Sequence, residues 1–304
     1  MSPVWTREWR IGWGFALPGL TLLLIVMGFP LVYSAIMAVS SLTLMHPSLS
    51  PLVGGDNFAT ILASPGFWHA LWLTFGYSLV TVTGEFVIGL GVALMLDRVT
   101  ALKPVYFAIL TIPMAMSPVS VGLIWRMLLQ PNLGIANHLL ERAGLPRLDW
   151  LGSSDLAFWT MAGIDIWQQV SFVVLILAAG LAALPREPYE AAEVDGATAV
   201  QQFWFLTLPM LRPVAAIAII IQLINEFRTY DLTYVLTKGG PGTSTEVLSF
   251  FAYRRAFLGL SLNEGAAASF MLLAVVLAMT LAFFATLERR AGPSARAAAG
   301  GAGG

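Results

Sequence analysis

The chain has 304 residues, of which 58% are hydrophobic and 11% are charged, and its mean hydropathy is +0.78. Soluble domains carry about 25% charged residues, so the composition excludes an ordinary water-soluble protein and predicts an all-α polytopic membrane protein. The net charge of −1 excludes a basic field for nucleic acid, and the absence of Cys excludes disulfides, thiolate metal sites and cysteine nucleophiles.

Six apolar segments are long enough to cross a bilayer, which takes about 20 residues of helix. In chain order they are residues 12–40, 69–96, 104–130, 156–184, 211–237 and 265–287. Arg7 and Arg10 precede the first segment as they would a signal peptide. Its apolar run of about 25 residues is too long for the usual signal sequence, so we expect a retained span. Residues 12–288 are the predicted transmembrane domain, between a cytoplasmic tail of residues 1–11 and a flexible cytoplasmic tail of residues 289–304.

Lys and Arg are distributed unequally between alternate loops, nine on one side and five on the other. The nine are Arg7, Arg10, Arg98, Lys103, Arg186, Arg212, Arg289, Arg290 and Arg296; the five are Arg142, Arg147, Lys238, Arg254 and Arg255. The excess on the first side predicts that both termini lie in the cytoplasm. No segment outside the spans is long enough for an ATPase or a binding domain, so any energy source is expected on another chain.

The cytoplasmic loop between spans four and five has the features of two short helices joined by a turn. Pro188 suits the first turn of a helix, where Glu187 and Glu190 complement the positive helix end. Gly196 permits a sharp reversal, and a second short helix is expected to lead to Pro209. The pattern predicts a compact helix–turn–helix with small residues where another protein could approach.

This coupling loop, residues 186–209, resembles the EAA loop of ABC-importer permeases, in which Glu-Ala-Ala, a Gly and Ile/Leu-x-Leu-Pro recur at fixed spacing. The matching residues are Glu190, Ala191, Ala192, Asp195, Gly196, Ala197, Leu206, Leu208 and Pro209. Leu206 stands where Ile is commoner. The resemblance implies that these residues dock in a cleft of a cytoplasmic ATPase and transmit its closure to the transmembrane helices. An ordinary amphipathic connector is the alternative interpretation.

Further segments are similar to the carbohydrate-importer branch of these permeases. They are Pro113, Pro118-Val119, Trp125, residues 134–137, Trp150-Leu151, Ala178, Leu181, Pro185, residues 227–231 and residues 236–245. The resemblance implies a six-helix type I importer permease in a bacterial inner membrane. It also implies a second homologous permease, two cytoplasmic ATPases and an extracytoplasmic solute-binding protein as partners. Any ATP and Mg²⁺ would be bound by the partner ATPase, with no cofactor in this chain. The solute would be a sugar or polyol, with glycerol phosphates also open.

Polar side chains within the spans are costly and usually face a cavity or a partner. Near the middle of span five, Gln222, Asn225, Glu226 and Tyr230 occur at helical spacing, and Gln168 lies at the middle of span four. Amide, carboxylate and phenol groups suit sugar hydroxyls, so these five residues are predicted to line a solute path near mid-membrane. The alternative is that they hold helices together through hydrogen bonds.

Four other charged residues in the spans have simpler interpretations. Arg228 and Asp231 are three residues apart and are expected to neutralise each other. Arg126, near the external end of span three, can extend its charge to the interface. Glu85 in span two has no partner that the sequence reveals.

A secondary transporter driven by protons is the main alternative function, with Glu85, Asp165, Glu226 and Asp231 as a relay. Such proteins often contain inverted repeats, which this sequence lacks, and the EAA-like loop would have no role in them. An intramembrane enzyme is disfavoured because there is no nucleophile–base constellation. The three His residues are too dispersed to suggest a metal site. Residues 239–242 are Gly-rich but lack the end of a phosphate loop, so we expect a turn.

Overall fold

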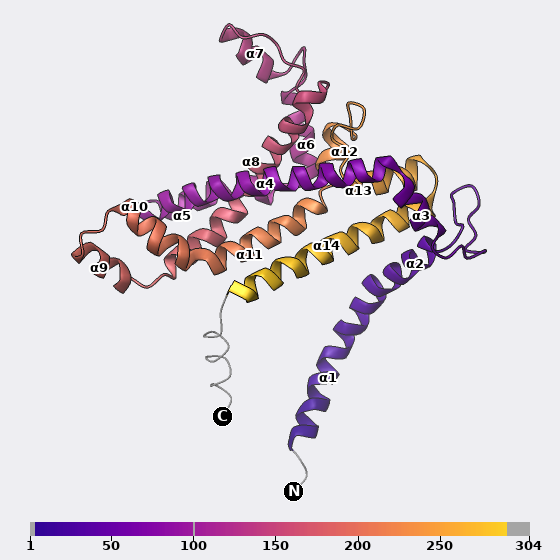
Figure 1. The fold of residues 1–304 in the computed structure, drawn as a ribbon, viewed down its shortest axis with the longest axis horizontal. Helices are drawn as coiled ribbons and strands as arrows, with labels where there is room; N and C mark the ends of the chain where they lie inside the picture. Colours follow the sequence, from indigo (N-terminus) through magenta and orange to yellow (C-terminus); the bar gives the residue numbers. More distant parts are fainter. Residues whose placement is uncertain (1–3, 100, 291–304) are drawn as a thin grey trace. The chain divides into compact units, whose positions relative to one another are not determined.

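The computed structural model describes residues 4–99 and 101–290, which form helices joined by loops (Figure 1). Within this part of the chain the only β pairing is an isolated bridge between Ser40 and Leu52. The chain divides into two compact units, Met1–Pro65 with Phe251–Met271, and Gly66–Phe250 with Leu272–Gly304. The predicted tail of residues 289–304 lies outside the described residues from position 291 onward.

The described residues form fourteen α-helices and three π turns. The elements up to residue 65 are α1 (Val4–Leu23), the π turn η1 (Leu24–Gly28), α2 (Phe29–Ala38) and α3 (Asp56–Ala63). The second unit contains α4 (Pro65–Arg98), α5 (Lys103–Ala115), α6 (Pro118–Leu128), α7 (Ile135–Arg142), α8 (Ser154–Ala182), α9 (Glu187–Val194), α10 (Ala199–Gln202), the π turn η2 (Phe203–Thr207), α11 (Leu208–Phe227) and α12 (Asp231–Leu236). After these come α13 (Leu248–Tyr253), the π turn η3 (Arg254–Leu258) and α14 (Leu262–Arg290).

Five helices among the described residues are long and apolar enough to cross a membrane, and a bent pair would make a sixth span. This confirms the predicted all-α membrane class. The prediction of one continuous span over residues 104–130 is wrong, because α5 and α6 meet at 90°. The break follows from Pro118, since a residue before proline avoids the helical region; Ser117 is extended, with ψ 135°.

The predicted span of residues 211–237 is also wrong at both ends. At its start, α10, η2 and α11 are continuous from Ala199 to Phe227. The π turn ends two residues before Pro209 and accommodates the missing N–H within an unbroken helix. At its end, the helix stops at Phe227 with Arg228 as its C-cap. The hydroxyl of Ser249 donates to the carbonyl of Thr229, which the ended helix leaves without a helical partner.

The first unit is joined by hydrogen bonds around the buried Asn57. Its side-chain amide donates to the carbonyls of Ala38 and Ser40, both at 2.8 Å, and its carbonyl oxygen accepts from Asn263 at 2.9 Å. The Arg255–Glu264 ion pair, 3.3 Å between Nη1 and Oε2, adds a second link. These contacts fix the end of α2, α3 and the start of α14 to one another.

The second unit is built on close packing of α8 against α4 on one side and α11 on the other. A Cβ added to Gly89 of α4 would lie 2.9 Å from Cγ1 of Val173, and one added to Gly180 of α8 would lie 2.8 Å from Cγ1 of Val214. Small residues let membrane helices approach closely. The resulting core contains Ala93, Val173, Leu177, Leu181, Leu211 and Ala215.

Two loop segments cited for the carbohydrate-importer resemblance are held by their own polar residues. Asn137 is 2% exposed; its amide donates to the carbonyls of Pro131 and Leu148, and its oxygen accepts from Trp150 at 3.0 Å. Residues 239–242 form turns, as predicted. Thr245 closes this segment by donating to the carbonyl of Gly240 at 2.8 Å.

Candidate functional site

The first arm of the coupling loop is α9, whose two ends follow directly from its sequence. Pro188 lies in its first turn, together with the acidic Glu187 and Glu190. Its C-terminus is a Schellman motif, in which Gly196 has φ +78° and donates to the carbonyl of Glu193. Ala197 donates to the carbonyl of Ala192 at 2.9 Å. The Asp-Gly-Ala part of the resemblance is therefore a helix-ending device.

The second arm begins with a capping box that starts a long helix. The side chain of Thr198 accepts from the backbone N–H of Gln201, and Gln201 Oε1 accepts from the backbone N–H of Thr198 at 2.8 Å. From there α10, η2 and α11 run without a break. The prediction of a separate second short helix is therefore wrong. The second arm of the coupling loop is the N-terminal part of the continuous helix that forms span five.

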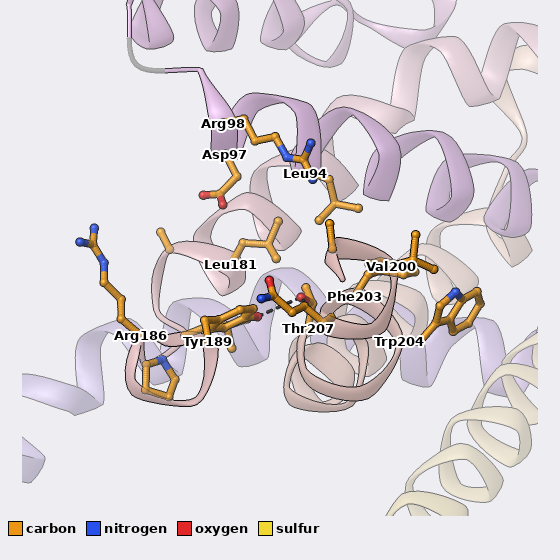
Figure 2. A pocket seen from close by; sticks show the side chains of 15 residues that line it. Leu94, Asp97, Arg98, Leu181, Arg186, Tyr189, Val200, Phe203, Trp204 and Thr207 are labelled. Carbon is orange, nitrogen blue, oxygen red and sulfur yellow. Dashed lines mark hydrogen bonds between the residues drawn. The ribbon is translucent and has the colours of Figure 1, made fainter. Parts of the chain in front are cut away.

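A single side-chain hydrogen bond links the two arms of the coupling loop. The hydroxyl of Tyr189 on α9 donates to Oγ1 of Thr207 at 2.9 Å (Figure 2). The bond lies beside a cavity of about 720 Å³ that the loop shares with the ends of α4 and α8. Leu94, Asp97 and Arg98 line the α4 side of this cavity. The bond ties α9 to the last residue of η2, immediately before α11.

The nine residues matched to the EAA loop divide into an exposed set and a half-buried set. Glu190, Ala191, Asp195 and Gly196 are exposed; Ala192, Ala197, Leu206, Leu208 and Pro209 are half-buried. Val194 of α9 is 89% exposed. The outer face of α9 thus presents small, apolar and acidic side chains, while the other five residues are partly covered.

A second polar region lies within the core, where α4, α8 and α11 meet. Glu85, Asp165 and Glu226, which we call the acidic triad, each offer a carboxylate oxygen within 4.8 Å of the other two. Their exposed fractions are 0%, 3% and 1%. Tyr77 donates to Oδ2 of Asp165 and Gln222 donates to Oε2 of Glu85, both at 2.6 Å.

No Lys, Arg or His in the described part of the chain forms an ion pair with the acidic triad. Two unit charges 4 Å apart interact by about 4 kcal/mol at an effective dielectric constant of 20. Three adjacent buried carboxylates without a compensating cation therefore cannot all be ionised, and at least one of them is expected to be protonated. Three of the four residues of the hypothetical proton relay meet here, whereas Asp231 is exposed and lies beyond the end of α11.

The residues predicted to line the solute path do not share one helix face. Gln222 and Glu226 are buried in the last turns of α11, and Asn225 donates to Gln222 at 3.2 Å. Tyr230 lies after the helix end and stacks on Tyr234 with 5.5 Å between ring centroids. Gln168 donates to the carbonyl of Met116, in the break between α5 and α6, at 3.0 Å.

Three details of the sequence interpretation need correction. Asn225 and Glu226 lie at the end of their helix rather than its middle, because the helix stops at Phe227. Glu85 has a partner, Gln222, contributed by a helix 137 residues away in the sequence. Arg228 and Asp231, both within the described residues and both exposed, form no ion pair with each other.

Tyr77 is the functional candidate that sequence reasoning missed. It is fully buried and binds Asp165, and it lies two helical turns before Glu85 on α4. The spacing of Tyr77, Thr81 and Glu85, at i, i+4 and i+8, is the signal that could have revealed a polar face on span two.

The chain is similar to known proteins over most of its length. Residues 85–290 match the family model described as "Binding-protein-dependent transport system inner membrane component". The chain belongs to this family. It is the permease subunit of an ABC importer, which confirms the resemblance drawn from residues 186–209 and favours this function over a secondary transporter.

Named relatives cover almost the full length of this permease. The trehalose/maltose transport system permease protein MalF of Thermococcus litoralis is 33% identical over 277 residues, which is 91% of this chain and 93% of the relative. The sulfoquinovosyl glycerol transport system permease protein SmoG of Agrobacterium fabrum is 30% identical and covers 95% of each chain. A chain of a bacterial ABC transporter that imports the acidic polysaccharide alginate superposes with a TM-score of 0.81 at 25% identity, covering 93% of this chain and 96% of that one.

Proposed function

We propose that this permease moves a sugar or related polyhydroxyl solute into the cell, working with a second homologous permease, two cytoplasmic ATPases and an extracytoplasmic binding protein. The observation that carries the proposal is α9, a short helix with an exposed small-residue face, joined through a Schellman turn to the helix that forms span five. The names of the relatives support a solute with several hydroxyl groups.

In this proposal, the coupling-loop residues named above transmit ATPase closure to the membrane helices. The exposed residues of α9 dock on the ATPase. The Tyr189–Thr207 bond and the continuous rod from Ala199 to Phe227 carry the displacement into α11. Because α11 packs against α8 at Gly180, both helices respond together. ATP and Mg²⁺ are bound and ATP is hydrolysed on the partner ATPase, and this chain supplies no catalytic group.

The solute path is proposed to include Gln168, Gln222, Asn225, Glu226 and Tyr230. Amide and carboxylate groups suit hydroxyls, and the ring of Tyr230 suits a sugar C–H face. Gln222 and Glu226 are each 1% exposed, so the path is closed in the conformation described.

If this permease imports a polyhydroxyl solute, that solute should activate the assembled importer. When the assembled complex is reconstituted in proteoliposomes, binding protein loaded with a polyhydroxyl solute should stimulate ATP hydrolysis and solute accumulation together. A panel of disaccharides, polyols and glycerol phosphates would identify the solute class. Uptake by the permease alone, driven by a proton gradient without ATPase, would instead support the secondary transporter.

Both termini and the coupling loop are proposed to face the cytoplasm of a bacterial inner-membrane protein. The chain has no native Cys, so single Cys substitutions report topology without background. Val194→Cys and Leu133→Cys form a matched pair, because the native side chains are 89% and 84% exposed. A membrane-impermeant maleimide added to intact spheroplasts should label position 133 and not position 194. The reverse pattern would invert the orientation.

A further inference from the structure

The cavity of about 720 Å³ beside the coupling loop is separate from the surface proposed to dock on the ATPase. It is not lined by the exposed residues of that surface, Glu190, Ala191, Asp195 and Gly196. Its walls come from the end of α4, the end of α8 and the start of the helix that begins at Ala199. These are the ends of three candidate spans, so the cavity lies where the hydrocarbon of a bilayer meets its headgroups.

Three charged side chains line this cavity, and none of them has a partner among the described residues. Asp97 and Arg98 are the last two residues of α4, and Arg186 precedes α9 on the opposite wall (Figure 2). None of the three forms an ion pair or a side-chain hydrogen bond with another residue that the structure describes. The cavity therefore presents two positive charges and one negative charge to an occupant.

Much of the remaining lining is apolar and includes an aromatic residue suited to the membrane interface. Leu94, Leu181 and Phe203 contribute hydrocarbon surface. Trp204 lies at one side of the cavity (Figure 2) and is 58% exposed. Trp is enriched at the depth of lipid headgroups, where its ring contacts both hydrocarbon and water. A cavity with charged and apolar walls at this depth suits an amphipathic ligand.

We propose that this cavity binds the headgroup of one phospholipid that carries a primary ammonium group, as phosphatidylethanolamine does. Arg98 and Arg186 hold the phosphodiester, because guanidinium groups form paired hydrogen bonds to phosphate oxygens. Asp97 accepts from the ammonium group. It lies in the last turn of α4, where the negative end of the helix also favours a cation. Basic pockets between membrane helices are known sites for lipid headgroups.

The charge pattern distinguishes this lipid from other phospholipids. Phosphatidylglycerol and cardiolipin have phosphates but no ammonium group, so they leave Asp97 without a partner. The ammonium group of phosphatidylcholine carries three methyl groups and has no N–H to donate to a carboxylate. The inference goes beyond the proposed function, because a lipid at this position connects the end of α4 to the coupling loop.

Native mass spectrometry of the assembled importer, freed of lipid and then titrated with single phospholipids, tests the proposal. Phosphatidylethanolamine should bind the wild type about fivefold more tightly than phosphatidylglycerol or phosphatidylcholine, the upper range for exposed charged contacts. Arg98→Gln and Arg186→Gln should each weaken its binding about fivefold. Asp97→Asn should abolish the preference over phosphatidylglycerol. Arg212→Gln is the matched control, because Arg212 is also exposed but does not line the cavity.

Unchanged phosphatidylethanolamine binding in the double variant Arg98→Gln/Arg186→Gln would overturn the proposal. An equal loss in Arg212→Gln would overturn it too, because general positive charge would then explain the binding. Tighter binding of phosphatidylglycerol or cardiolipin to the wild type would contradict the role of Asp97. All four substituted residues are exposed, so the variants should assemble normally. No readout involves solute or nucleotide, so a failure here leaves the proposed function untouched.

Discussion

Gly196→Val should reduce solute-stimulated ATP hydrolysis by the assembled importer at least about tenfold, while the permease still inserts into the membrane. Gly196 has φ +78° at the end of α9, and an added Cβ would meet no atom within 4 Å. The effect therefore comes from the backbone alone. A residue with a Cβ pays about 1–2 kcal/mol in the left-handed region, and 1.4 kcal/mol is a factor of ten in an equilibrium. Val should thus release the Schellman turn and misplace α9.

Gly144→Val provides a control with matched strain. Gly144 has φ +75° and also has open space around its Cβ position, but it lies in the loop after α7, far from α9 in Figure 1. The Gly144→Val variant should leave solute-stimulated ATP hydrolysis unchanged. Gly196→Asn should restore most of the activity, because Asn tolerates the left-handed region. ATPase pull-down and stimulated turnover, measured on the same preparations, check this, and normal values for Gly196→Val would contradict the coupling role of the loop.

Glu226→Gln should lower solute uptake at least about tenfold while the complex still assembles. Gln keeps the size of the side chain and replaces one carboxyl group of the acidic triad by a neutral amide, so it adds no uncompensated charge to the core. It also removes the carboxylate that is proposed to accept a solute hydroxyl, and such charged hydrogen bonds contribute about 1.5–3 kcal/mol. Glu226→Ala should lower assembly as well, because it leaves a void where Glu226 is 1% exposed.

Uptake and complex yield measured on the same membranes separate the two roles of Glu226. Asp155→Asn, which exchanges an exposed acid at the start of α8 for its amide, should preserve both. Wild-type uptake by Glu226→Gln would remove Glu226 from the solute path. Failure of Glu226→Gln to assemble would instead make it a structural residue that holds α11 in the core.

The sequence predicted the class, the family and the coupling loop because these depend on local chemistry. Apolar segments of membrane length can only be helices or barrel strands in lipid, and a helix ended by Asp-Gly-Ala can be recognised from its residue types. The Schellman turn at Gly196 is an example. It needs a residue in the left-handed region, and glycine is the residue type that adopts this conformation most readily. The continuity of the helices was harder to predict, because two prolines act differently. The π turn before Pro209 keeps the helix continuous where a break was expected, whereas the helices on either side of Pro118 meet at 90°.

The partners of polar residues were decided only by the tertiary structure. Glu85 and Gln222 are 137 residues apart, and no periodicity in either span relates them. The close approach of α4, α8 and α11 at Gly89 and Gly180 brings three carboxylates within 4.8 Å, a distance set by helix packing and not by sequence spacing. Residue types along the chain were enough to predict a membrane protein, its family and the turn at Gly196 that ends α9. The meeting of Glu85, Asp165 and Glu226 in one buried cluster depends on contacts between distant helices, which only the folded chain defines.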